Sequence, residues 1–493
     1  MRVDFLGHAT LLIRHGALTL LTDPWWSGPA YAGQWYPYPL PVPERYDLRQ
    51  VDAVYVSHAH EDHLHAETLR EVLRAAPTAQ ALIPRRYDTQ MRDYLRRIGF
   101  RRIREVPSGT PLTLRKRGSA MRLTLITHMD DSLMAVEADG EVLVNANDAL
   151  HASRRDLIDE YCRILRRRFP RIHFLFCAYG GASYFPNCFH VPGKDDHAVA
   201  TAREAFFLRN FALITHQLQP AHAFPFAAHF VLPEERTWWI SALRLQAEPP
   251  SHTIGRFLGE SNTSLHDLQP GDFVDSSAVH VSPPAVHDDV EHVRYVVLAR
   301  YPSRTERPAL AADDFEDLVH NVRTSIARHT LGAAERLDAV IALVDVPAQA
   351  IHVAIEDGTA SVAGVERSAV DRMQPELVFE THSDLLKRTM RSPFGRDLIS
   401  IGYGAEVRIR SQRDMQRGQH ERLLALLAPP QPRWRHHFRK HPLRTLGFVV
   451  GDPSMRYALA GRLLERRRRR RPVAPEPGLY ELGDWALLAQ SPE

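Results

Sequence analysis

The sequence predicts an α/β fold followed by a smaller α+β module. Two observations predict this organisation. In the first half of the chain, short apolar or alternating runs typical of β-strands alternate with stretches of helical periodicity. A break with several prolines at residues 270–284 then separates this half from a second series of strands. The 493 residues are enough for two domains. We therefore expect three segments, at residues 1–275, 290–412 and 413–493.

The chain opens with a β-meander and a long aromatic loop. The expected strands are Val3–Phe5, Thr10–Arg14 and Leu18–Thr22. Asp23-Pro24 breaks this pattern, and residues 25–49 are rich in Trp, Tyr, Pro and Gly. Because exposed aromatic side chains on this scale promote association, we expect the loop to line a pocket.

Strands and helices alternate through the rest of the first half. Apolar or alternating runs predict strands at Val51–Ser57, Ala81–Pro84, Arg102–Val106, Arg122–Thr127, Ser132–Glu137, Val142–Ala146, Ile172–Ala178 and Ala221–Phe226. The helical spacing of apolar residues predicts helices at Ala66–Ala75, Asp88–Gly99 and Ala198–Gln217. This alternation is typical of an α/β domain.

The second series of strands has the pattern of a small α+β unit. The expected strands are Ala339–Val344, Ala350–Ile355, Thr359–Val362, Glu376–Thr381 and Ala405–Ile409, with a helix at Ser383–Met390. The order of strand, helix, short helix and strand at its end resembles the end of a sterol-carrier-type lipid-binding module. The alternative is a small α+β cap of another kind.

The stretch Val54–His63 carries the strongest functional signal. An apolar run ends in His58, His60, Asp62 and His63, in the pattern H-x-H-x-D-H. Imidazole and carboxylate groups are ligands of zinc, iron and manganese. Alternate residues of an extended segment project to one side, so His58 and His60 can share a metal. If the chain then turns, Asp62 and His63 point toward a second, adjacent metal. The alternative is a polar loop that is rich in histidine by chance, in a chain with 27 histidines.

The motif and its N-terminal context resemble the metallo-β-lactamase fold superfamily. Phe5–Ile13 (FLGHATLLI) and Leu20–Pro29 (LLTDPWWSGP) are similar to one branch of it. That branch includes N-acyl phosphatidylethanolamine phospholipase D, ascorbate-6-phosphate lactonase and the lactamase-like part of CMP-N-acetylneuraminate hydroxylase. The resemblance implies a four-layer αββα sandwich that binds two divalent metal ions, zinc or iron.

The resemblance also implies ligands beyond the first motif. The superfamily supplies a third histidine, a bridging aspartate and a last histidine, each after a later strand. His128, Asp148 and His229 match these positions in this chain. One carboxylate that spans both cations lowers their mutual repulsion, which is the role expected of Asp148. His222 and His190 compete with His229 for the last position.

Other polar residues are expected to support these ligands. His8 and Asp23 match positions typical of the same branch, and both follow predicted strands. We expect them behind the ligands, although His8 could equally be a core histidine. Asp130 and Asp131 adjoin His128 and could orient an imidazole ring. Their alternative role is to cap the turn.

Two chemistries fit a site of this kind. The first is a dinuclear metallohydrolase, in which two metals activate a bridging water to attack an ester, phosphodiester, lactone or amide of a small-molecule substrate. Asp62 could then accept a proton while it also holds the second metal. We favour this interpretation.

The second chemistry, implied by the likeness to the hydroxylase, is a diiron oxygenase that acts on a small molecule or natural product. This chain lacks the combination of a Cys-x-His pair and a later Cys-x-x-His pair that marks the hydroxylase's Rieske domain. Its electrons would therefore come from a separate electron-donor partner. A third interpretation, a lipid-binding protein with a vestigial metal site, is disfavoured by the complete ligand set.

The composition is that of an ordinary globular protein, with 44% hydrophobic and 25% charged residues. We expect a cytoplasmic protein, because the sequence shows no apolar run of membrane-span length, no leader at Met1 and only three cysteines. Arg462 and Arg466–Arg471 form a cationic run beside several prolines. This run predicts a solvated tail or contact with an anionic membrane surface. Nucleic acid is not expected, since no recognition fold accompanies the arginines.

Overall fold

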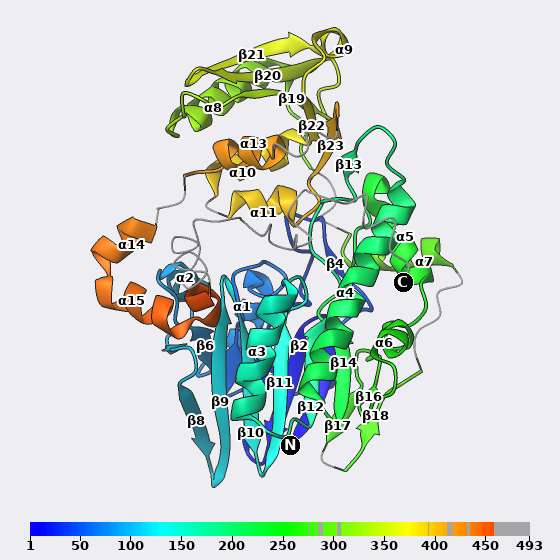
Figure 1. Cartoon of the computed structure of the whole chain (residues 1–493), viewed down its shortest axis with the longest axis vertical. Helices are drawn as coiled ribbons and strands as arrows, with labels where there is room; N and C mark the ends of the chain where they lie inside the picture. The colour runs from blue at the N-terminus through cyan, green and yellow to red at the C-terminus, as the bar shows by residue number, and fades with distance from the viewer. Residues whose placement is uncertain are drawn as a thin grey trace, which may run out of the picture.

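The computed structural model describes residues 1–275, 277–283, 289–302, 307–392, 394–411, 418–430 and 434–457. Within these residues, two β-sheets pack against each other in the lower part of the molecule as drawn. A third sheet lies above them (Figure 1).

The first sheet is mixed and begins with the predicted meander. In spatial order it contains β18 (Val279–His280), β17 (Phe273–Asp275), β1 (Arg2–Gly7), β2 (Thr10–His15), β3 (Leu18–Thr22), β5 (Ala53–Tyr55), β6 (Gln80–Pro84) and β7 (Ile103–Val106). β1, β2 and β3 are antiparallel, and β5 to β7 continue from β3 in parallel. The carboxyl ends of β1, β3 and β5 therefore lie at the same edge of the sheet.

The second sheet faces the first. In spatial order it contains β16 (Ser264–Leu265), β14 (His222–Phe226), β12 (Phe174–Ala178), β11 (Glu141–Asn147), β10 (Asp131–Ala138), β9 (Ser119–His128) and β8 (Pro111–Lys116). β8 to β11 are antiparallel, whereas β11, β12, β14 and β16 are parallel. The carboxyl ends of β9, β11 and β14 consequently share one edge.

Helices cover the outer faces of both sheets. α1 (Ala66–Ala75) and α2 (Gln90–Ile98) pack their apolar sides on the first sheet. α3 (Arg155–Arg168), α4 (Asp196–Leu218) and α6 (Pro250–Leu258) do the same on the second sheet. The apolar side chains between the sheets form their own core. The arrangement is the four-layer αββα sandwich that the resemblance implies, and this prediction is confirmed.

The upper sheet belongs to an α+β module. In spatial order it contains β13 (Phe189–His190), β23 (Ala405–Ile409), β22 (Leu377–Thr381), β19 (Leu337–Leu343), β20 (Gln349–Glu356) and β21 (Thr359–Glu366). Its helices are α8 (Phe315–Ala327), α9 (Val370–Met373), α10 (Ser383–Arg391), α11 (Gly395–Ser400) and α13 (Gln419–Leu427). A single apolar cluster joins its core to Trp25, Tyr31 and Trp35 of the aromatic loop. The module therefore packs directly over that loop.

Elements cross between the two parts of the chain. β13 comes from the first half of the sequence but pairs with β23. α7 (Val290–Arg300) packs beside α5 (Glu235–Gln246), β4 (Tyr36–Pro37) and β15 (Phe230–Val231) of the first half. The expected segments 1–275, 290–412 and 413–493 stay a prediction, as does the sterol-carrier likeness of the module.

After the α+β module, the chain again packs against the αββα sandwich. α14 (Trp434–Lys440) and α15 (Pro442–Gly451) lie beside α2, as Figure 1 shows. The predicted cationic run, Arg462 with Arg466–Arg471, falls outside the described residues. Within the part of the chain that the structure describes, none of the helices is both long and apolar enough to cross a membrane.

Candidate metal centre

The candidate site lies where the strand ends of the two sheets meet. His8 follows β1, Asp23 follows β3, and Asn147 ends β11. All three have left-handed backbone conformations, with φ of 47°, 38° and 48°. Such angles are uncommon for residues other than glycine, and they persist where the surrounding structure enforces them. The tight turns aim polar side chains from both sheets at one point.

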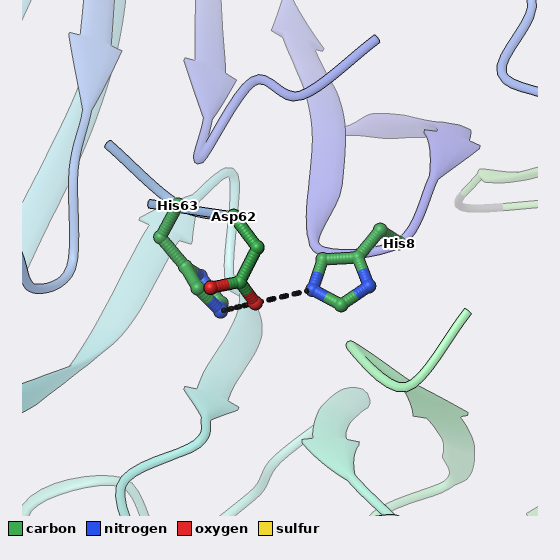
Figure 2. Close-up of side chains that lie close together, drawn as sticks. All are labelled: His8, Asp62 and His63. Carbon is green, nitrogen blue, oxygen red and sulfur yellow. Dashed lines mark hydrogen bonds and ion pairs between the residues drawn. The ribbon is translucent and has the colours of Figure 1, made fainter. Parts of the chain in front are cut away.

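The first donor group consists of His8, Asp62 and His63, all buried. Figure 2 shows Asp62 between the two imidazole rings. Its Oδ2 atom lies 3.0 Å from His8 Nε2 and 3.1 Å from His63 Nε2. His8 therefore belongs to a donor group, whereas the sequence predicts it only as a residue that supports the ligands.

The second donor group consists of His58, His60 and Asp148. His58 is buried, whereas His60 and Asp148 are half-buried. His58 Nε2 lies 2.7 Å from His60 Nδ1. The motif residues thus fall into two groups, with His58 and His60 in one and Asp62 and His63 in the other, and their role as metal ligands stays a prediction. The second group is thus the more exposed of the two.

The two groups adjoin through His63 and Asp148. His63 Nε2 lies 3.4 Å from Asp148 Oδ2, and the rings of His63 and His58 have centroids 4.2 Å apart. Asp148 of the second group therefore contacts His63 of the first, and its role as a bridging carboxylate stays a prediction.

The donor set fits divalent metal ions. Asp148 Oδ1 and His8 Nδ1 are buried without a hydrogen-bond partner among the described residues. Buried polar atoms normally have a partner, so each such atom calls for a ligand or another explanation. Imidazole and carboxylate donors without cysteine suit zinc and iron alike. The residues of the two groups therefore fit metal binding.

A layer of hydrogen bonds orients the donors. The Ser57 hydroxyl is 2.8 Å from His58 Nδ1. Asn147 Nδ2 donates to Ser57 Oγ and to Asp23 Oδ2, both at 2.6 Å. Asp23 Oδ2 is in turn 3.5 Å from His63 Nδ1. Partners of this kind fix the ring orientation of metal-binding histidines. Asp23 belongs to this layer, and its role as a support for a metal ligand stays a prediction.

Tyr31 supports Asp62 from the aromatic loop. Its hydroxyl donates to Asp62 Oδ1 at 2.6 Å. Burial raises the pKa of this hydroxyl well above its usual value, so Tyr31 stays protonated and can donate. The sequence places Tyr31 only in a loop expected to line a pocket and offers no spacing that pairs it with Asp62. Asn147 was missed too, although it directly precedes Asp148 at a strand end.

The charged groups of the site stabilise one another. Burial raises the pKa of the Asp62 carboxyl, but His63 and His8 outweigh this effect and hold the pKa well below its usual range. Burial lowers the pKa of His63, yet Asp62 and Asp148 raise it well above its usual value. Without a metal, the His63 imidazolium therefore compensates the carboxylates. A metal that binds there must displace this proton, because a ligating histidine is neutral.

His128 and His229 lie outside both donor groups of the described residues. His128 Nε2 is 3.1 Å from the Ser153 hydroxyl, and burial lowers the pKa of its imidazole to about 4. His229 packs against Phe5, with ring centroids 5.1 Å apart, and burial lowers its pKa to about 3. Both rings are neutral at pH 7, as ligands must be, and their role as metal ligands stays a prediction.

The competing histidines lie farther away. His222 starts β14, at the opposite end of the strand from the site, and its Nδ1 is 3.1 Å from His266 Nε2. His190 lies 3.5 Å from Glu406 of the α+β module. Neither of them belongs to a donor group in the described part of the chain.

A cavity of about 630 Å³ lies beside His229. Residues of α4, of α6 and of the segments around them form much of its apolar wall, among them Ala205, Leu208, Phe257 and Leu268. Its size and mixed lining are typical of small-molecule sites. Phe230, which also lines the cavity, has its ring 6.2 Å from the ring of His8. The cavity thus lies close to the first donor group.

We expect the substitution Tyr31→Phe to weaken metal binding about 10- to 100-fold, which is the usual effect of removing a partner of a metal ligand. The matched control is Tyr184→Phe. Tyr184 belongs to the same apolar cluster, but its buried hydroxyl has no hydrogen-bond partner among the described residues. Titration with a competing chelator measures both variants, and equal affinities in the two would contradict a role for the Tyr31–Asp62 hydrogen bond.

Part of this chain is similar to known proteins. Residues 2–153 match the family model of the beta-lactamase superfamily domain. A Mycobacterium tuberculosis protein that carries the name of a Rieske 2Fe-2S iron-sulfur protein is 32% identical over 203 residues, which is 39% of this chain and 37% of that protein. Cytidine monophosphate-N-acetylneuraminic acid hydroxylase of Danio rerio is 25% identical over 288 residues, 56% of this chain and 43% of the hydroxylase. The matches thus span about two fifths of the length of these curated relatives.

Among solved structures, the metallo hydrolase Igni18 of Ignicoccus hospitalis aligns over 55% of this chain and 97% of its own, with 15% identity and a TM-score of 0.35. The family model covers β1 to β11 and thus the whole H-x-H-x-D-H motif together with Asp148. The relatives match over longer stretches of the chain. Residues 2–153 of this chain therefore match the beta-lactamase superfamily domain.

Proposed function

We propose that the protein is a dinuclear metal-dependent hydrolase of an ester, phosphodiester, lactone or amide bond in a small molecule. The observation that carries this proposal is the pair of adjoining donor groups, which meet at His63 and Asp148. Hydrolysis needs only water as its second reactant. Apart from the metal ions and water, this chemistry therefore requires no cosubstrate and no electron donor.

Bound metal ions would supply an activated water near neutral pH and would stabilise negative charge on the substrate oxygen. Asp62 is the residue to which we assign proton transfer. Its low pKa keeps it ionised, so it would accept a proton only transiently and pass it on. Tyr31 occupies Oδ1, so Oδ2 is the atom that faces the donor group.

The substrate would approach along the half-buried side of His60 and Asp148. The cavity beside His229 could take an apolar part of the molecule, because it is large enough for a small ligand. The α+β module packs over the aromatic loop. It would therefore limit the access of bulk water to the donor groups from the side of that loop.

A second function is favoured by the names of the relatives. Cytidine monophosphate-N-acetylneuraminic acid hydroxylase and the Rieske-named protein are both similar to this chain. An iron-loaded site could thus serve a diiron oxygenase, since the donor set suits iron. The given sequence lacks the Rieske combination of a Cys-x-His pair and a later Cys-x-x-His pair, so this function would need an electron donor beyond it.

One experiment separates the two functions. The protein is purified without added metal, its zinc and iron are quantified, and it is assayed with and without oxygen. We expect zinc and hydrolysis of p-nitrophenyl esters, bis(p-nitrophenyl) phosphate or simple lactones at equal rates in both atmospheres. Two irons per chain, with oxygen consumption by the reduced protein and no hydrolysis, would contradict the hydrolase proposal and support the oxygenase.

A further inference from the structure

Helix α15 exposes a stripe of apolar side chains. Leu443, Leu446 and Val450 are 82%, 53% and 59% exposed, and Gly447 lies among them. Their spacing of three, four and seven residues places them on one face of the helix. Surface leucines are normal when they are scattered singly, but a contiguous apolar face marks an interaction site.

The opposite face of α15 is firmly anchored. Thr445 and Phe448 are buried, and the ring of Phe448 packs 5.3 Å from that of Tyr87. Arg444 donates to Glu105 at 3.0 Å and also contacts the carbonyl of Asp88. The orientation of the helix is thus fixed by buried contacts with the sandwich. The apolar stripe therefore faces solvent because of this docking.

Cationic side chains flank the stripe. Arg439 and Lys440 are exposed just before α15, and Arg456 is exposed just after it. Residues 434–451 contain no Asp or Glu, and Asp452, the first acidic residue after them, is buried. Phe438 and Tyr457 add further exposed aromatic surface, at 43% and 42%. Asp156, which accepts a hydrogen bond from the Tyr457 hydroxyl, and the exposed Asp130 beside Met129 are acidic groups of neighbouring elements. Within residues 434–451, the apolar stripe and its cationic neighbours are complementary to a surface with anionic groups over an apolar interior.

We propose that α14, α15 and Arg456 form a docking surface for an anionic lipid membrane. Helices that lie in the membrane interface combine an apolar face with Lys and Arg at its edges. Three apolar side chains alone bind weakly, so binding should require anionic lipid and should weaken with salt. The stripe is too narrow for a tight protein partner, whose interface core would need a broader buried patch.

The surface lies close to the metal-site edge of the sandwich. Met129, in the turn between β9 and β10, is 56% exposed, and its N–H donates to the Ser454 hydroxyl at 3.1 Å. His128 directly precedes it. Docking of α15 would therefore bring this edge of the sheet near the lipid surface.

The test uses the full chain with its metals. Co-sedimentation is measured with vesicles of phosphatidylcholine alone and of phosphatidylcholine mixed with phosphatidylserine. The variant is Leu443→Glu, Leu446→Glu. The matched control is Tyr295→Glu, Val344→Glu, because Tyr295 on α7 and Val344 after β19 are 69% and 49% exposed elsewhere on the protein. All four side chains are exposed, so both variants should keep the wild-type melting temperature and metal content.

We expect the wild type and the control to bind the phosphatidylserine vesicles and to release them as salt rises. The Leu443→Glu, Leu446→Glu variant should bind roughly tenfold or more weakly, since it places two anions in the apolar face. The proposal is overturned if the wild type binds neither kind of vesicle. It is also overturned if the variant binds as well as the control, or if the stripe instead holds two copies together, so that the wild type is a dimer and the variant a monomer in gel filtration.

Discussion

The double substitution His58→Ala, His60→Ala is expected to remove most metal from the second donor group and nearly all turnover. Both imidazoles belong to this group, and Asp148 alone cannot hold a divalent cation against water. A bound metal contributes several kcal/mol of transition-state stabilisation, so the loss in kcat should be on the order of a thousandfold. Metal analysis of the purified variant, together with its kcat, measures both effects.

The control for this experiment is His222→Ala, His266→Ala. These two histidines form a hydrogen-bonded pair of the same kind, at 3.1 Å, but they lie far from the strand ends that build the site. The control should retain the wild-type metal content. Full metal content in the His58→Ala, His60→Ala variant would show that the motif does not bind metal. Equal losses in both variants would mean that the effect reflects damage to the fold.

Asp148→Asn is expected to have the next largest effect. The amide keeps the size of the side chain but removes the negative charge between the two donor groups. Two cations that lack a shared carboxylate repel each other, so one metal per chain should be lost. Activity should then fall about a hundredfold or more, because both metals take part in the chemistry.

Asp131→Asn provides the comparison. Asp131 lies 3.4 Å from His58 Nδ1 but belongs to neither donor group in the described part of the chain. Burial and then Asp148 raise the pKa of Asp131 well above its usual range, so an amide resembles its neutral form. Asp131→Asn should retain two metals per chain. If Asp131→Asn instead loses a metal and Asp148→Asn keeps both, Asp148 is not the carboxylate that bridges the metals.

The sequence predicts much of this fold because its signals are local. The helix at Ala66–Ala75 has the predicted bounds, since apolar side chains at helical spacing mark its buried face. α3 was missed although Ile158, Tyr161, Cys162 and Leu165 have the same kind of spacing. The pairing of β13 with β23 joins residues more than two hundred positions apart, and no local pattern indicates such a contact.

For the candidate site, too, the sequence predicts what depends on local signals and misses what depends on long-range contacts. His58, His60, Asp62 and His63 are close in sequence, so their grouping follows from local geometry. The position of His8 depends on a left-handed turn after β1 and on contact with a distant segment. These features do not appear in the pattern of residues around it. Sequence alone therefore identifies the motif but cannot separate the ligands from the residues that support them.

Anomalous diffraction from crystals of the full-length protein, recorded at the zinc and iron absorption edges, tests the central claim most directly. We expect two adjacent peaks. One should lie about 2.0–2.2 Å from a ring nitrogen of both His58 and His60, and the other at the same distance from His63 with Asp62 beside it. Asp148 should lie between the two peaks. The absorption edge at which the peaks appear identifies the metal as zinc or iron. A single peak, or peaks remote from His58 and His63, would contradict the dinuclear site.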